Sequence, residues 1–98
     1  MPYIIETFDK SGHADMRIRE RDAHLAYLDQ HKPLLLACGA KLNDDGSGAG
    51  GGMYVIDVDT REEAERFIAA DPFSSAGLFE RVTITRWRKA YFDGECCL

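Results

Sequence analysis

The sequence lacks the features that mark secreted, membrane and nucleic-acid-binding proteins. Its 98 residues include only three cysteines, too few for a disulfide framework. No apolar run approaches the ~20 residues that span a bilayer, and the N-terminus has no basic segment followed by a long apolar core, as a secretory signal would. A net charge of −5 disfavours binding to a phosphate backbone. We therefore expect a cytoplasmic protein that binds neither nucleic acid nor membrane.

The length allows a single domain. We place it at residues 1–93, followed by a C-terminal tail at residues 94–98 that carries Cys96 and Cys97. We assign no role to these two thiols, because chain ends usually fray. Cys38 lies in an apolar run and is predicted to be a small buried hydrophobe. A chain this short buries a modest fraction of its surface, so association with other subunits would stabilise it.

Apolar periodicity and turn residues predict two helices and four strands. The helices are expected at residues 17–31 and about 61–70, and the strands at residues 3–8, 34–42, 53–58 and 81–87. Asp15 is the expected N-cap of the first helix, and Pro33 enforces its stop. Thr60 and Glu63 match a capping box at the start of the second helix. Asp71-Pro72 ends that helix, and residues 73–79 are expected to be an irregular connection.

A glycine-rich segment separates the second and third strands. Gly39 is expected to be a bulge, and residues 46–52 to be a mobile hairpin loop. Gly46-Ser47-Gly48-Ala49-Gly50-Gly51 fits the letters of the dinucleotide-binding fingerprint. That fingerprint requires a helix directly after it to meet the pyrophosphate, whereas a strand is predicted here. Nucleotide binding is therefore not expected.

The order of elements is β-α-β-β-α-β, the ferredoxin-like arrangement of an α+β protein. Both helices of this arrangement lie on one face of the sheet. No residues remain to cover the other face, so we expect a second copy to cover it. The sequence thus predicts a homodimer or a higher homo-oligomer.

The three histidines do not form a metal site by their spacing. His24 and His31 lie seven residues apart on one predicted helix, which separates them by about 10 Å. Zinc binds its ligands at about 2 Å, so one ion cannot reach both. No Cys-x-x-Cys or His-x-x-x-His pattern is present. We expect neither a metal nor another cofactor.

Of the three histidines, His24 is the candidate for a general base. Arg21 lies three residues before it and Arg17 seven residues before it, on the same helix stripe. Both arginines would stabilise an anion beside the histidine. A carboxylate commonly orients a histidine that acts as a general base, and Asp71 is a candidate for that carboxylate. A helical histidine is more often an ordinary surface or core residue, and periodicity alone does not bring Asp71 to His24.

Two motifs resemble those of the YciI-like family. Residues 17–25 are similar to its R-x-x-x-R-x-x-H-L motif, and residues 70–79 to its A-D-P-[FY]-x-x-A-G-[VL]-[FY] block. The first strand and the basic last strand resemble the family's as well. The resemblance covers about nine-tenths of the chain and leaves out only the cysteine-containing tail. The glycine-rich hairpin departs from the family pattern.

The resemblance implies a dimeric α/β barrel with an active site built on His24 and Asp71. It places the family's helix arginine at Arg21 and its aromatic residue after the proline at Phe73. We expect Arg17, Arg21, Phe73 and Ser74 to bind the substrate. A branch of the family that resembles this chain dechlorinates hydroxylated aromatics, and more distant relatives isomerise muconolactones.

We therefore expect a cofactor-independent lyase or isomerase that acts on a small hydroxylated ring, for example by dehydrochlorination of a chlorohydroxyquinol. His24 would remove a proton, Asp71 would orient it, and an arginine would stabilise the anion. The alternative is a non-catalytic module that binds or senses a small molecule in the same pocket. A purely structural oligomer is a third possibility, and it would leave the arginine and histidine stripe without a purpose.

Overall fold

The computed structural model describes residues 1–98 and has the predicted ferredoxin-like order, which is confirmed. The four main strands form one antiparallel sheet in the order β2-β3-β1-β4. The elements are β1 (Tyr3–Asp9), α1 (Ala14–Gln30), a 3-10 turn (Lys32–Leu34), β2 (Leu35–Leu42), β3 (Gly48–Ile56), α2 (Arg61–Ala69), α3 (Pro72–Ser75) and β4 (Phe79–Arg86).

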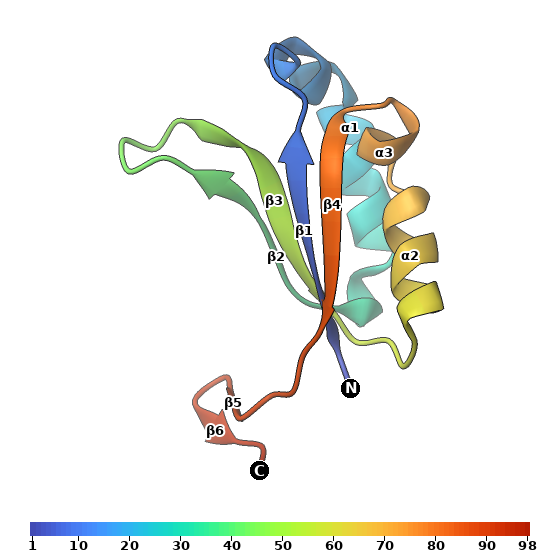
Figure 1. The fold of residues 1–98 in the computed structure, drawn as a ribbon, viewed down its shortest axis with the longest axis vertical. Helices are drawn as coiled ribbons and strands as arrows, with labels where there is room; N and C mark the ends of the chain where they lie inside the picture. The colour runs from blue at the N-terminus through green and yellow to red at the C-terminus, as the bar shows by residue number, and fades with distance from the viewer.

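All three helices lie on one face of the sheet (Figure 1). Alternate residues of the two central strands point into this layer, as the pleat requires, and they pack against the apolar side of α2. None of the helices is long and apolar enough to cross a membrane. The buried core consists of Tyr3, Ile5, Tyr54, Ile56, Val58, Ala64, Phe67 and Ile68.

The helix starts show one error in the predictions and one partial agreement. Helix α1 begins at Ala14, and its N-cap is His13 rather than Asp15, which lies in the first turn. An acidic side chain there still complements the positive end of the helix dipole. In α2, the Thr60 hydroxyl accepts the backbone N–H of Glu63 as expected, but the Glu63 carboxylate accepts a hydrogen bond from that hydroxyl instead of from the Thr60 backbone.

The glycine-rich segment is a strand for most of its length, so the predicted loop at residues 46–52 is wrong beyond residue 47. Strand β3 begins at Gly48, and the hairpin turn is closed by Asn43 and Ser47. The irregularities of β2 flank Gly39 instead of falling on it, because Gly39 pairs regularly with Met53. Gly52 pairs with Thr7 of β1 on one side and with Ala40 of β2 on the other, so the neighbouring strands hold this part of the segment in the sheet although it has no side chains to pack.

Two other expectations also fail. Cys38 is exposed on β2 instead of buried, because β2 is the edge strand of the sheet. The connection after Asp71 is partly helical, since Pro72–Ser75 forms the single turn of α3. Proline is favoured in the first turn of a helix, where its missing N–H has no partner to lose.

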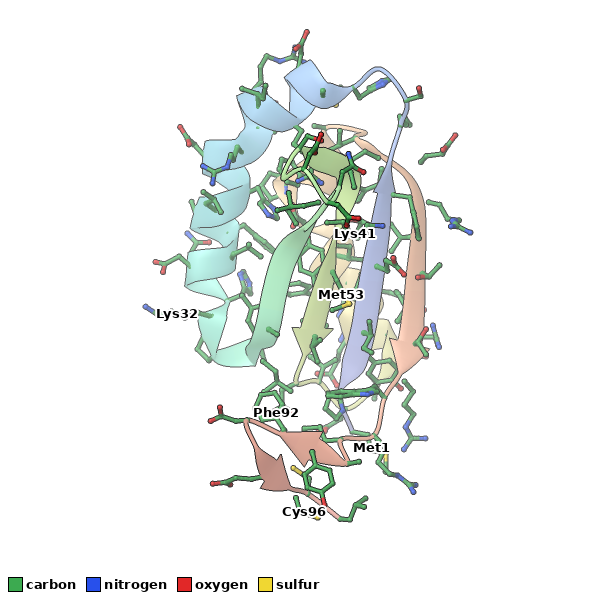
Figure 2. All side chains as sticks on the ribbon, turned by 90° about the vertical axis from the view of Figure 1, so that its left-hand side faces the viewer. Met1, Lys32, Lys41, Met53, Phe92 and Cys96 are labelled. Carbon is green, nitrogen blue, oxygen red and sulfur yellow. The ribbon has the colours of Figure 1, made fainter.

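The face of the sheet opposite the helices carries no layer of the same chain, and Figure 2 looks onto it. Met53 is 46% exposed there. Lys41 pairs with Glu6, and its ammonium group lies 3.7 Å from the centre of the Phe8 ring. We call this surface the open face.

The chain ends in a small separate hairpin of β5 (Tyr91–Phe92) and β6 (Glu95–Cys96). It extends beyond the end of the main sheet (Figure 1). The predicted boundary between residues 93 and 94 falls in the turn of this hairpin, at Asp93 and Gly94, which both have positive φ. Cys96 and Cys97 are exposed and unpaired.

Gly51 is the glycine on which the sheet depends most. It has a φ of 155°, and a Cβ atom at this position would collide with the Thr7 carbonyl oxygen of the neighbouring strand. We predict that Gly51→Ala lowers the free energy of unfolding by about 1–3 kcal/mol or more, the usual range for strained backbone. Gly48→Ala is the control, because a Cβ there meets nothing within 4 Å. Equal urea midpoints for the two variants would contradict the prediction.

Candidate functional site

The structure brings His24 and Asp71 together although 47 residues separate them in the chain. The His24 Nδ1 atom lies 2.9 Å from both carboxylate oxygens of Asp71. His24 is the one buried residue of α1, and Asp71 is fully buried at the junction of α2 and α3. Because a carboxylate only accepts hydrogen bonds, Nδ1 carries the hydrogen. The lone pair of the neutral ring is therefore on Nε2.

The Asp71 carboxylate accepts from two further donors. The backbone N–H of Phe73 donates to Oδ1 at 2.8 Å, and the Tyr54 hydroxyl donates to Oδ2 at 3.1 Å. A buried charge is costly unless hydrogen bonds replace its hydration. Asp71 is also the N-cap of α3, so the Asp-Pro sequence that ends α2 fixes the carboxylate in place.

Phe73 holds the other side of the imidazole. Its ring stacks on His24 with the ring centres 4.0 Å apart and the planes inclined by 15°. Phe73 is 1% exposed, so it shields the imidazole from water and restricts its rotation. The aromatic residue after the proline thus positions the histidine as well as lining the cavity.

A cavity of about 350 Å³ opens in front of this pair, between α1 and the β2–β3 hairpin. Such a volume suits a small molecule with a single ring. The strands β2 and β3 contribute small residues to its lining (Gly39, Ala40 and Gly52), so side chains do not fill the cavity. The lining residues are Arg17, Arg21, His24, Leu25, Leu28, Cys38, Gly39, Ala40, Gly52, Tyr54 and Phe73.

The two arginines of the cavity differ in their charge balance. Arg17 forms a two-point ion pair with Asp9, at 2.6 and 3.1 Å, and its guanidinium lies 4.7 Å from the centre of the Phe73 ring. Arg21 is exposed and has no ion-pair partner. Arg21 is therefore the cation whose charge is available to a bound anion.

The remaining predicted site residue, Ser74, does not line the cavity. It follows Phe73 in the single turn of α3, and neighbouring residues of a helix point about 100° apart. Asp71 does not line the cavity either, because it lies behind the imidazole. No group of three or more His, Cys, Asp or Glu side chains is arranged to hold a metal ion.

Tyr54 and Cys38 belong to the site but were missed from the sequence. Burial and the negative charge of Asp71 raise the pKa of Tyr54, so its hydroxyl keeps its proton. Cys38 is exposed as a whole, but its thiol is partly desolvated at the cavity, and this desolvation together with the charge of Asp71 raises the pKa of the thiol to about 11. A signal for Tyr54 was present, because a tyrosine on the core face of a strand needs a partner for its hydroxyl.

The fold and the site define a small ferredoxin-like domain with a hydrogen-bonded His–Asp pair behind a ring-sized cavity. The chain belongs to the family of YCII-related domains, whose model matches residues 1–88. It is 31% identical to Protein YciI of Escherichia coli O6:H1 over 98 residues, which cover 93% of this chain and 100% of that protein. Protein YciI of Shigella flexneri matches equally well, with the same identity and coverage.

A solved structure is also similar in both sequence and fold. It is the 5-chloro-2-hydroxyhydroquinone dehydrochlorinase TftG from Burkholderia phenoliruptrix AC1100, in complex with 2,5-dihydroxybenzoquinone. The TM-score is 0.82 and the sequence identity is 31%, over 90% of this chain and 94% of that one. The similarity therefore extends over the strands and helices that build the site.

The raised pKa of Cys38 predicts slow alkylation. Only the thiolate reacts with iodoacetamide, and a pKa of about 11 leaves roughly one thiol in a thousand ionised at pH 8. We predict that Cys38 is alkylated far more slowly than Cys96 and Cys97 at pH 8, and that its rate rises about tenfold per pH unit up to about pH 11. Mass spectrometry of the three sites against time and pH measures this. Equal rates at pH 8 would contradict it.

Proposed function

We propose that this protein is a cofactor-independent lyase that eliminates hydrogen chloride from a small chlorinated hydroquinone or hydroxyquinol. The observation that carries the proposal is the buried hydrogen bond between His24 and Asp71 behind a ring-sized cavity. Similarity to the dehydrochlorinase TftG supports the reaction class. That enzyme was solved with a dihydroxybenzoquinone, which is of the size and chemical type of the expected product.

His24 is the general base in this proposal. With the hydrogen on Nδ1 held by Asp71, Nε2 is the nitrogen that can take a proton from a ring hydroxyl. The buried carboxylate stabilises the imidazolium that results, as the carboxylate of a catalytic triad does. Phe73 keeps the ring in place and limits access of water to it.

Arg21 stabilises the phenolate that forms. It lines the cavity one turn before His24, and no carboxylate of the chain neutralises it. Arg17 is neutralised by Asp9, so we assign it the role of holding Phe73 and shaping the cavity. A preorganised cation beside a developing oxyanion is commonly a large contribution to catalysis.

The reaction balances without an oxidant or a reductant. His24 removes the proton of a hydroxyl next to the chlorinated carbon and returns a proton to that carbon, which gives a keto form with an sp3 C–Cl centre. The hydroxyl para to the new carbonyl then loses its proton. Its electron pair forms the second C=O bond, the ring double bond shifts, and the C–Cl bond breaks. The products are a benzoquinone, chloride and one proton.

We also propose that the protein is a homodimer in which a second copy covers the open face. The central strands there present Met53 and the half-buried side chains of Ile4 and Phe8 beside the Lys41–Glu6 pair. Burial of this sheet face would complete the two-layer packing that a sheet of this type requires.

Substitution of the histidine tests the function directly. We predict that His24→Asn lowers kcat on 5-chloro-2-hydroxyhydroquinone by about 10²–10⁴-fold, the usual contribution of a general base, and that Asp71→Asn follows it closely. Chloride release and quinone absorbance measure turnover. The control is His31→Asn, because His31 caps the C-terminal end of the same helix, hydrogen-bonds the Tyr27 carbonyl and does not line the cavity.

Two results would contradict the proposal. Full activity of a folded His24→Asn protein would exclude the base, provided that circular dichroism matches the parent. Tight binding of the hydroxyquinol or of the quinone without any turnover in the parent protein would instead favour the non-catalytic binding module.

The assembly has its own test. We predict that sedimentation at micromolar concentration gives at least twice the monomer mass of 11.0 kDa. Met53→Asp places a charge at the centre of the open face and should shift the protein towards monomer, because a buried unpaired charge is costly. Glu65→Lys on the exposed side of α2 is the control and should leave the mass unchanged. A monomeric parent protein would contradict the dimer.

A further inference from the structure

Tyr54 is placed in the site by the sheet. It belongs to β3, is 3% exposed, and is the only aromatic residue of that strand. Its ring lies edge-on to His24 and to Phe67, with ring centres 6.2 and 6.1 Å away. Its hydroxyl donates to Oδ2 of Asp71 and has no other hydrogen-bond partner in the protein.

The hydroxyl has no evident function in packing. A phenylalanine would fill nearly the same space and would avoid the cost of burying a polar group. The hydroxyl instead completes the set of donors around the carboxylate, in which each donor comes from a different part of the fold. The backbone of α3 holds Oδ1 through Phe73, α1 supplies His24, and the sheet holds Oδ2 through Tyr54.

The position of Nδ1 gives this third bond its importance. Because Nδ1 lies 2.9 Å from both oxygens, the histidine does not by itself select one orientation of the carboxylate. Phe73 fixes one oxygen, and only Tyr54 fixes the other. Without Tyr54, the carboxylate can turn about its Cβ–Cγ bond, and the geometry that keeps the hydrogen on Nδ1 is relaxed.

We propose that Tyr54 is a positioning residue, which clamps Asp71 to the sheet so that His24 keeps its hydrogen on Nδ1 and its Nε2 lone pair towards the cavity. This inference rests on the proposed role of His24 as the base. Burial and the charge of Asp71 raise the pKa of Tyr54, so it remains a donor throughout the pH range in which an enzyme of this kind works.

The test compares two tyrosines. Tyr54→Phe removes the hydroxyl bound to Asp71, whereas Tyr27→Phe removes one that donates to the Phe67 backbone carbonyl at 2.7 Å. Both variants lose one hydroxyl from the helix-covered side of the molecule. Long-range ¹H–¹⁵N NMR spectra report which nitrogen of His24 carries the hydrogen, and they need no substrate.

We expect Tyr54→Phe to lower the Nδ1–H fraction of His24, while Tyr27→Phe leaves it as in the parent. We also expect kcat on 5-chloro-2-hydroxyhydroquinone to fall by about ten- to a hundredfold in Tyr54→Phe, the loss expected for one hydrogen bond to a charged group. KM should change less than twofold, because the ring that lines the cavity remains. An unchanged His24 tautomer in folded Tyr54→Phe would overturn the proposal.

Two further observations keep the test decisive. If Tyr54→Phe does not fold, the parent protein is used: a slowly exchanging Tyr54 hydroxyl proton with an NOE to Hδ1 of His24 supports the clamp, and a freely exchanging one overturns it. If His24→Asn keeps full activity, the proposed function fails, but the tautomer comparison still decides whether Tyr54 positions the pair.

Discussion

The buried carboxylate of Asp71 is the group around which the site is organised. It is fully buried, so it requires donors, and the three donors come from α1, β3 and α3. Each of these hydrogen bonds requires that the helix or strand that carries the donor lies at a particular position relative to Asp71. The cost of leaving a buried charge unpaired, about 3–5 kcal/mol for a broken pair, is therefore a constraint on the whole helical layer. The site and the packing of that layer share the same hydrogen bonds.

Helix α1 illustrates this dependence. An ordinary surface helix buries an apolar stripe, but the one buried residue of α1 is His24, and Ile18 is 71% exposed. The helix is held by polar and aromatic contacts, such as the Tyr27 hydroxyl on the Phe67 carbonyl and the stacking of His24 on Phe73. Because few large side chains fill the space between α1 and β2, the cavity remains open beside the imidazole.

Much of the fold and the centre of the site could be predicted from the sequence. Strand and helix periodicity gave the element order, and the Asp-Pro turn and the capping residue Thr60 marked the boundaries of α2 because these signals are local. The family motifs brought His24 and Asp71 into one hypothesis, which their contact supports. The extent of β3 was missed, because its pairing partners lie elsewhere in the chain and glycine has no strand preference of its own.

Features that depend on the third dimension were also out of reach. The pairing of Arg17 with Asp9 crosses from α1 to the end of β1, and no spacing in the sequence distinguishes it from a free arginine. A strand tyrosine on the core face needs a partner for its hydroxyl, but the sequence does not show that the partner of Tyr54 is Asp71, because the register that points Tyr54 at Asp71 is set by pairing with β1 and β2. Ser74 follows Phe73 in the chain but does not line the cavity, because neighbouring residues of a helical turn point in different directions.

The arrangement of charge in the site favours the proposed removal of a proton from a ring hydroxyl by His24. A negative carboxylate lies behind the imidazole, out of contact with the cavity, and an unneutralised guanidinium, that of Arg21, lines the cavity in front. In the proposed reaction, proton transfer from the substrate to His24 would create a cation beside the carboxylate and an anion beside the arginine, and charges already in place would stabilise both. In a partly desolvated cavity such charges act more strongly than in water. A site that only bound a neutral ring would gain nothing from this opposition of charges.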